Sequence, residues 1–314
     1  MFTVTNKSPG FQERHICAPL ALLTLNINGH IMDAKIITVD IFGGLGNQMF
    51  QYAMGKALAS RLGCGLLLNV AGLAGDPLRK YALDCFPIPD TVDLLTEKSG
   101  IRRLWKRFIP VSSSKIIKEP HFHYWDGIER IAAIGARLHG YWQSPLYFAG
   151  FEEQLRNIFT FASMPDAVRE LANEMKRLNS VAMHVRRGDY LKPEVSAVHG
   201  EADICYYQKA YALIQSLCPE NRLYIFSDDV REAKKLLGSW ERACFIEGYT
   251  QEQDMFLMGL CSYHIIANSS FSWWGAWLAG PSSRQVIAPR AWFSPRHQRA
   301  KNTADLFPPS WILI

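Results

Sequence analysis

Short apolar segments alternate along the chain with longer stretches in which apolar residues recur at the spacing of a helix. Residues 36–42 are apolar and rich in β-branched side chains, and they run into a glycine-rich turn. From Met49 to Leu62, apolar positions recur every three or four residues, as in a helix with one buried face. Residues 65–70 predict a second buried strand. The pattern therefore predicts a strand, a glycine turn, a helix and a further strand.

The same alternation returns in the second half of the chain, whereas residues 76–120 carry several prolines and predict irregular structure. Apolar strands are predicted at 180–185, 222–226, 244–247, 264–267 and 285–288. Helices are predicted at 166–178, 204–217, 250–262 and 273–279. Strands that alternate with helices predict an α/β fold with a parallel sheet. Ligands of such sheets bind at the carboxyl ends of the strands, where the polar motifs of this chain fall.

Length and composition agree with a chain of two α/β lobes. The 314 residues correspond to about two domains. Contents of 48% hydrophobic and 20% charged residues exclude disordered and collagen-like proteins. We expect residues 1–31 to be a mobile extension, because the strand signal starts only after Met32, which offers an alternative start of translation. The two lobes are then expected at 32–165 and 166–314.

Net charge and cysteine content limit the binding partners and the cellular compartment that we expect for this chain. A net charge of +5 is too small to indicate nucleic acid, but it suits an anionic substrate. The seven cysteines form no C-x-x-C pair, which argues against a disulfide framework or a zinc site and favours a reducing cytosol. The apolar stretch 18–27 is shorter than the roughly 20 residues that span a bilayer. A basic run at 102–118 is most simply a solvated face, although it also suits a membrane surface or a charged acceptor.

The first polar motif is the glycine turn with the two amides that follow it. As a dinucleotide fingerprint the turn fails, because Met49 takes the place of the third glycine. No acidic residue lies between Asp40 and Asp76, where the ribose-binding carboxylate would be expected. A tight turn explains the glycines but leaves Asn47 and Gln48, at the start of the helix, without an explanation.

Two further motifs follow predicted strands and carry charge. His184 and Arg186 fall on the same face of the first of these strands, and Arg186 can offer a bidentate fork to a phosphate. Asp189, beyond a glycine, can hold an arginine in place or meet a hydroxyl group. Asp228 and Asp229 can bind a metal, act as acid and base, or accept hydrogen bonds from ribose or guanine. Either can instead cap the following helix.

The fourth motif is a serine-rich turn before a tryptophan pair. Hydroxyl groups and free amides at the amino end of a helix form an anion site. We expect the tryptophans Trp273 and Trp274 to lie in the core rather than in the site. The candidate anion-binding residues are Asn268, Ser269, Ser270, Phe271 and Ser272.

Together and in this order, the four motifs resemble the α-1,2-fucosyltransferase family. They are GGLGNQMFQYA (43–53), HVRRGDY (184–190), FSDD (226–229) and NSSFSWWGAWL (268–278), and the resemblance covers nearly all of 36–314. It implies a GT-B-like α/β fold, in which two Rossmann-like lobes flank a cleft, with GDP-fucose as donor and no required metal or other cofactor. The implied reaction moves L-fucose, with inversion, to the 2-hydroxyl of a terminal β-galactoside on an oligosaccharide or glycolipid. The lobe 32–165 would face the acceptor and the lobe 166–314 would bind GDP-fucose.

The resemblance also implies roles for single residues. Arg186 would neutralise the diphosphate, and His184 would line the nucleotide or fucose pocket. One aspartate of the FSDD motif, with Asp229 favoured over Asp228, would contact guanine or ribose, and the serine-rich turn would face the phosphates. Asn47, with Gln48, would face the acceptor or the reacting sugar. Asp189 is a candidate catalytic base, although a structural role is favoured for it.

Two other functions stay open at this point. One is transfer of another deoxysugar from a GDP-linked donor. The other is a catalytically silent protein that binds nucleotide sugars during polysaccharide assembly. In each case the expected location is cytoplasmic, with peripheral contact of the basic run at the inner face of the membrane as an option.

Overall fold

The structure of the chain is a computed structural model. It describes most residues in the second half of the chain and many in the first half. The described residues are 36–76, 79–93, 115–132, 135–161, 163–188, 197–200, 202–238, 240 and 243–314. The predicted extension 1–31 and most of the basic run 102–118 lie outside these residues.

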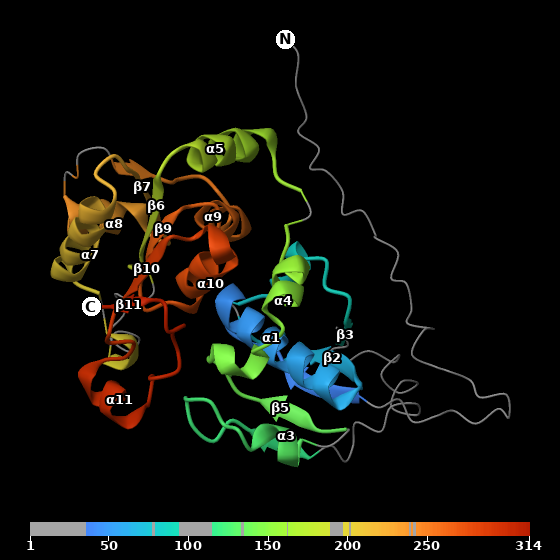
Figure 1. The fold of residues 1–314 in the computed structure, drawn as a ribbon. Coiled ribbons are helices and arrows are strands. Elements are labelled where there is room, and N and C mark those ends of the chain that lie inside the picture. The colour runs from blue at the N-terminus through green and yellow to red at the C-terminus, as the bar shows by residue number, and fades with distance from the viewer. Residues whose placement is uncertain are drawn as a thin grey trace, which may run out of the picture. The chain divides into compact units, whose positions relative to one another are not determined.

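The described strands form two sheets, in which every neighbouring pair is parallel (Figure 1). The first sheet has the order β3-β2-β1-β5-β4 and the second β11-β10-β9-β6-β7-β8. The predicted α/β fold with parallel sheets is therefore confirmed. The strands of the first sheet are β1 (Ile36–Asp40), β2 (Gly65–Asn69), β3 (Thr91–Asp93), β4 (Ile116–Lys118) and β5 (Arg137–His139). Those of the second are β6 (Ser180–Val185), β7 (Arg222–Ser227), β8 (Ala243–Phe245), β9 (Tyr263–Ile265), β10 (Gln285–Ala288) and β11 (Ile312–Leu313).

Helices cover both faces of the second sheet (Figure 1). Successive side chains of a strand point to opposite faces, so Val181 and Met183 pack toward α7 (Ile204–Leu217) and α8 (Val230–Leu237). Ala182, between them, packs on the other face with α5 (Asp166–Arg177) and α9 (Gln251–Met258). This arrangement explains the continuously apolar character of β6, which is buried along its whole length.

One aromatic core joins elements of both sheets. Helix α10 (Ser270–Leu278) follows β9 of the second sheet, yet its tryptophans pack on α1 (Leu45–Leu62), which follows β1 of the first. The ring of Phe50 lies 4.6 Å from that of Trp273 and 5.0 Å from that of Trp274, centroid to centroid. Both tryptophans are fully buried, as expected from the sequence.

Glycine permits the close approach of α1 and α10. A Cβ atom on Gly46 would lie 2.4 Å from the carbonyl carbon of Ser270, so any larger residue would force the helices apart. Gly43 has a φ of +76°, a left-handed conformation that favours glycine. The glycine turn is thus required both by its own backbone and by the neighbouring helix.

Several elements of the structure differ from the expected pattern. The segment expected to be irregular contains the three-residue strands β3 and β4, which are too short to show a periodic signal. The first sheet also includes β5, and short helices lie at α3 (Ile128–Ile131), α4 (Glu152–Ile158) and α11 (Pro295–Ala300). Helix α10 begins at Ser270 rather than at 273, and α9 ends at Met258 rather than at 262.

The close approach of the helices leads to a stability prediction. We expect Gly46→Ala to lower the free energy of unfolding by about 1–3 kcal/mol, the usual cost of overpacking. The matched control is Gly72→Ala, because a Cβ atom at Gly72 meets nothing within 4 Å. Urea unfolding of both variants measures the difference. Equal stabilities would show that α1 and α10 tolerate a side chain at their contact.

Candidate functional site

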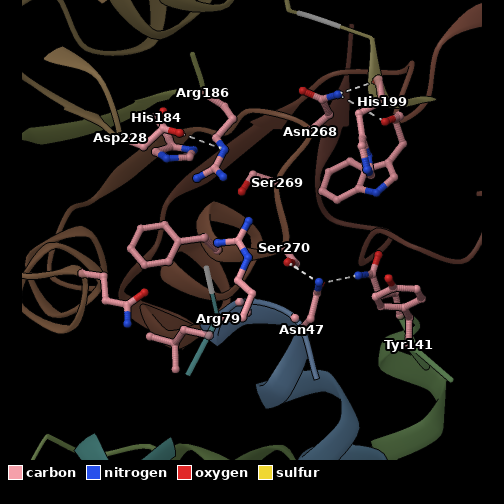
Figure 2. A pocket seen from close by; sticks show the side chains of 18 of the residues that line it. Asn47, Arg79, Tyr141, His184, Arg186, His199, Asp228, Asn268, Ser269 and Ser270 are labelled. Atoms are coloured by element: carbon pink, nitrogen blue, oxygen red, sulfur yellow. Dashed lines mark hydrogen bonds and ion pairs between the residues drawn. The ribbon is translucent and has the colours of Figure 1, made fainter. Parts of the chain in front are cut away.

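A pocket of about 810 Å³ lies where the carboxyl ends of strands from both sheets meet the amino ends of α1 and α10 (Figure 2). Its lining includes the glycine turn 43–46 from the first sheet and the ends of β6 and β7 from the second. The predicted residues Asn47, His184, Arg186, Asp228 and Ser270 all border it. The motifs, far apart in the sequence, therefore surround one cavity.

Asp228 fixes the arginine at the end of β6. Its Oδ2 atom lies 3.1 Å from Nε of Arg186, and its Oδ1 atom accepts a hydrogen bond of 2.9 Å from the backbone N–H of Arg187. A Cβ atom on Gly188 would lie 2.5 Å from Oδ2 of Asp228, so the glycine makes room for this carboxylate. Figure 2 shows the guanidinium of Arg186 pointing into the pocket near Ser269.

His184 is a neutral imidazole in the wall of the pocket. It is buried, and this burial lowers its pKa to about 4 against the opposing effect of Asp228. Its Nδ1 atom has no hydrogen-bond partner among the described residues. Val185, the next residue, packs into the core on the other face of the strand. At neutral pH, His184 can donate or accept a hydrogen bond without adding charge.

The two helices that meet at the pocket have no side-chain caps. Gly44 precedes α1 and Ser269 precedes α10, and neither side chain bonds the first turn of its helix. In contrast, α7, α8 and α9 are capped by side chains, those of Asp203, Asp229 and Thr250. Uncapped amino ends leave backbone N–H groups and the positive end of the helix dipole for an anion.

Asn47 links the two helix ends. Its Oδ1 atom accepts hydrogen bonds from Oγ of Ser270, at 2.7 Å, and from Nε2 of Gln143, at 2.8 Å. The side-chain amide of Asn268 donates to the backbone oxygens of His199 and Trp292 and so holds two segments of the pocket wall. Asn47 therefore lies at the contact between the two helix ends, whereas Asn268 holds two segments of the pocket wall together.

Three predicted residues lie elsewhere than expected. Gln48 is buried; its Nε2 atom donates to the backbone oxygens of Gly43 and Lys80, and its Oε1 atom accepts from the backbone N–H of Ala82. Ser272 is also buried, and its hydroxyl donates to the backbone of 267 and 269. Asp229, favoured over Asp228 from the sequence, caps α8 by accepting from the backbone N–H of residue 232. These hydrogen bonds of all three residues are made to the protein itself, and their expected roles in binding stay predictions.

The candidate base Asp189 lies outside the described residues.

Four charged residues of the pocket were not predicted: Asp76, Arg79, Asp254 and Lys301. Asp254 projects from α9, and burial, followed by the charge of Glu252, raises its pKa to about 7. Its Oδ1 atom has no hydrogen-bond partner in the described part of the chain. Arg79 reaches the pocket from the segment between β2 and β3, and a Cβ atom on Gly44 would lie 3.6 Å from its Nη1. Asp254 is followed in α9 by the apolar residues 255–258. A carboxyl group directly before such an apolar run is the signal that could have identified it.

Three further findings concern the described residues only. They contain no group of three or more His, Cys, Asp or Glu side chains placed to hold a metal ion. Their cysteines, six of the seven in the sequence, are unpaired. None of their helices has the length and apolar character needed to cross a membrane.

Comparison with known proteins gives a consistent set of relatives. The model of glycosyl transferase family 11 matches residues 11–314. An α-1,2-colitosyltransferase of Escherichia coli is 34% identical over 293 residues, covering 89% of this chain and 99% of that protein. A galactoside 2-α-L-fucosyltransferase, SEC1 of Bos taurus, is 25% identical over 295 residues, covering 85% of this chain and 74% of that protein. Among solved structures, the α-1,6-fucosyltransferase NodZ soaked with GDP-fucose has a TM-score of 0.48 and 15% identity, over 82% of this chain and 95% of that one.

The buried carboxyl of Asp254 leads to a prediction on pH and stability. Its pKa is raised from 3.8 to about 7 in the folded protein, so the folded state holds this proton more tightly than the unfolded state. Stability therefore falls as the pH rises from about 4 to about 7. We expect Asp254→Asn to remove this pH dependence. The free energy of unfolding of the variant, relative to that of the wild type, is then higher at pH 8 than at pH 5.

Urea unfolding at the two pH values measures this gain. Glu153→Gln, which changes an exposed carboxyl on α4, is the control and is expected to show no such gain. A difference between Asp254→Asn and the wild type that stays constant with pH would contradict the raised pKa of this buried carboxyl.

Proposed function

The chain belongs to glycosyltransferase family 11, and on that premise we propose that it transfers L-fucose from GDP-β-L-fucose to the 2-hydroxyl of a terminal β-galactoside, with inversion at the anomeric carbon. One observation carries this proposal. The guanidinium of Arg186, fixed by Asp228, lies beside the uncapped amino end of α10, and Asn47 lies across the pocket from it. This arrangement suits a diphosphate whose attached sugar reaches toward Asn47.

The proposed chemistry depends on charge that develops during the reaction. When the bond between fucose C1 and the phosphate oxygen breaks, negative charge grows on the leaving diphosphate and the sugar ring gains oxocarbenium character. Arg186 and the backbone N–H groups at the start of α10 stabilise that negative charge, because they are already oriented before the reaction. Ser269, which borders the pocket, supplies a further hydroxyl donor, whereas the hydroxyl of Ser270 donates to Asn47.

The nucleoside is proposed to bind through His184 and Asp254. Guanine presents an N1–H and an adjacent amino group, and a carboxylate can accept from both donors at once. The Oδ1 atom of Asp254, which lacks a partner among the described residues, fits this role. Neutral His184 adds a hydrogen bond without repelling the cationic side of the pocket.

Support for two lobes comes from the two parallel sheets. We place an acceptor-side lobe at 32–165 and a donor-side lobe at 166–314, in a GT-B-like arrangement. The pocket takes Asn47 from the first and Arg186 from the second, as such an arrangement requires. Lys35–Ile314 nevertheless pack as one unit, since α1 and α10 share a core.

The acceptor hydroxyl must lose a proton during transfer. A strongly dissociative transition state needs little help from a base, because bond cleavage runs ahead of attack. Asp189 is the candidate base from the sequence, and a pH–rate profile of Asp189→Asn tests it. A profile equal to that of the wild type removes Asp189 from this role.

The central prediction concerns Arg186. We expect Arg186→Ala to lower kcat/KM for transfer by about 100-fold or more, since one preorganised charge donor is lost at the leaving group. GDP release from GDP-fucose in the presence of a β-galactoside measures the rate. The control is Arg222→Ala, at the opposite end of the neighbouring strand β7.

Two outcomes would contradict this assignment. A folded Arg186→Ala variant that keeps more than about a tenth of the activity, a loss below about 1.4 kcal/mol, would remove Arg186 from the diphosphate site. Absence of GDP release from the wild type with all galactosides tested would favour the catalytically silent alternative.

The donor sugar has a second candidate, because one relative is an α-1,2-colitosyltransferase with 34% identity. Colitose differs from fucose by the loss of the 3-hydroxyl group. A site that hydrogen-bonds this hydroxyl rejects the sugar that lacks it by about 10⁴-fold, whereas an apolar site discriminates far less. We expect a higher kcat/KM with GDP-fucose than with GDP-colitose when both donors are measured with the same acceptor. The reverse order would make the protein a colitosyltransferase.

A further inference from the structure

One end of the pocket is lined by aromatic side chains that the proposed donor contacts do not use. We call it the aromatic end and define it by Phe42, Phe122, Tyr141, Phe293 and Lys301. The rings of Phe42 and Tyr141 form a T-shaped pair at 5.0 Å, and those of Phe122 and Phe293 form another at 4.9 Å, centroid to centroid. Figure 2 shows Tyr141 and Arg186 on opposite sides of Asn47 and Ser270.

Tyr141 is partly exposed, although its backbone is fixed by a hydrogen bond. Its side chain is 45% exposed, while the next residue, Trp142, is fully buried. Trp142 has a φ of +56°, a left-handed conformation that is strained for a large side chain. Strain of this kind persists only where the surrounding structure imposes it, and it gathers at functional sites.

Glu119 imposes this conformation. Its Oε2 atom accepts a hydrogen bond of 2.7 Å from the backbone N–H of Tyr141, and its Oε1 atom accepts one of 3.0 Å from that of Trp142. A Cβ atom on Gly140 would lie 2.4 Å from that of Glu119, so glycine is needed beside the carboxylate. Burial raises the pKa of Glu119 to about 7, against the opposing effect of the two backbone amides. The two hydrogen bonds from one carboxyl group hold the turn 140–143 in place.

The same turn reaches the place where the donor sugar is expected. Gln143, two residues after Tyr141, donates through its side chain to Oδ1 of Asn47. A ligand lying on Tyr141 would thus present its nearest groups at Asn47 and Ser270, between the two ends of the pocket.

A cation completes the aromatic end. The Nζ atom of Lys301 lies 4.3 Å from the ring centroid of Phe293 and 5.7 Å from that of Phe122. No hydrogen bond or ion pair of this Nζ atom is found among the described residues. Its ammonium group can donate to the hydroxyl oxygens of a ligand.

On the basis of the proposed function, we propose that the aromatic end is the acceptor subsite, with Tyr141 as the platform for the pyranose ring that receives the sugar and Glu119 as its positioning residue. Galactose has one face formed mainly by C–H groups, and such a face stacks on an aromatic ring while the hydroxyl groups at its edge find polar partners. Tyr141 supplies the ring, and Asn47 and Lys301, which also line the pocket, supply polar partners.

Three variants separate stacking from other roles of the loop. Tyr141→Ala removes the ring, Tyr141→Phe keeps it, and Leu146→Ala changes another exposed apolar side chain five positions along the chain. Binding of lactose to the protein saturated with GDP is followed by saturation-transfer NMR, and GDP affinity by calorimetry. We expect lactose binding to be lost in Tyr141→Ala and kept in the other two, with GDP affinity unchanged throughout.

Transfer kinetics at saturating GDP-fucose give a second readout. We expect the KM for lactose to rise by about tenfold or more in Tyr141→Ala, as for loss of an aromatic contact, while kcat changes less. Lactose binding and KM in Tyr141→Ala equal to the wild type would overturn the subsite. If the GDP-saturated wild type does not bind lactose, the aromatic end is not a galactoside subsite.

Glu119→Gln tests the positioning role. A glutamine offers one carbonyl oxygen, so one of the two amides loses its acceptor. We expect a higher KM for lactose with unchanged GDP affinity, whereas a general structural role would weaken both. If lactose and GDP bind as described but no donor is turned over, the proposed function fails and the subsite stands.

Discussion

The contact between the amino ends of α1 and α10 is the constraint on which the pocket depends. Gly46 brings the two backbones together, and the hydrogen bond between Asn47 and Ser270 joins them. Both helix ends are positive, so their approach is electrostatically unfavourable when the pocket is empty. The aromatic core behind them, where Phe50 packs on Trp273 and Trp274, offsets this cost through buried apolar area. An anion bound between the two helix ends would relieve this repulsion.

Helix α10 shows how one short segment serves both packing and chemistry. Its first turn borders the pocket and is polar, whereas the residues one turn later are fully buried tryptophans. The indole N–H of Trp273 donates to the backbone oxygen of Leu306 and so ties the helix to the carboxyl-terminal segment. A helix that is buried nearly all round cannot rotate or slide, so the direction of its first-turn N–H groups is fixed by the core.

The sequence predicted the long elements and the motifs better than the directions of single side chains. Period and β-branching located β1, α1 and β6, and alternation along β6 placed His184 and Arg186 on one face. Adjacent polar residues were not separable in this way: Asn47 borders the pocket while Gln48 bonds the backbone behind it, since successive helical residues point about 100° apart. Asp254 and Tyr141 were missed for another reason. Neither belongs to a polar motif, and only tertiary packing brings each to the pocket.

Local groups, rather than the net charge of the chain, would attract an anion to this pocket. A net charge of +5 spread over 314 residues would be screened within about 10 Å in ordinary salt. The pocket instead combines the guanidinium of Arg186, oriented by Asp228, with two uncapped helix ends that carry no formal charge. Because these groups are fixed by the core and by Asn47, they need little reorganisation when a charge develops beside them. The proposed binding of an anion would therefore depend on local geometry rather than on net charge, and we expect a variant of zero net charge with the same pocket to keep it.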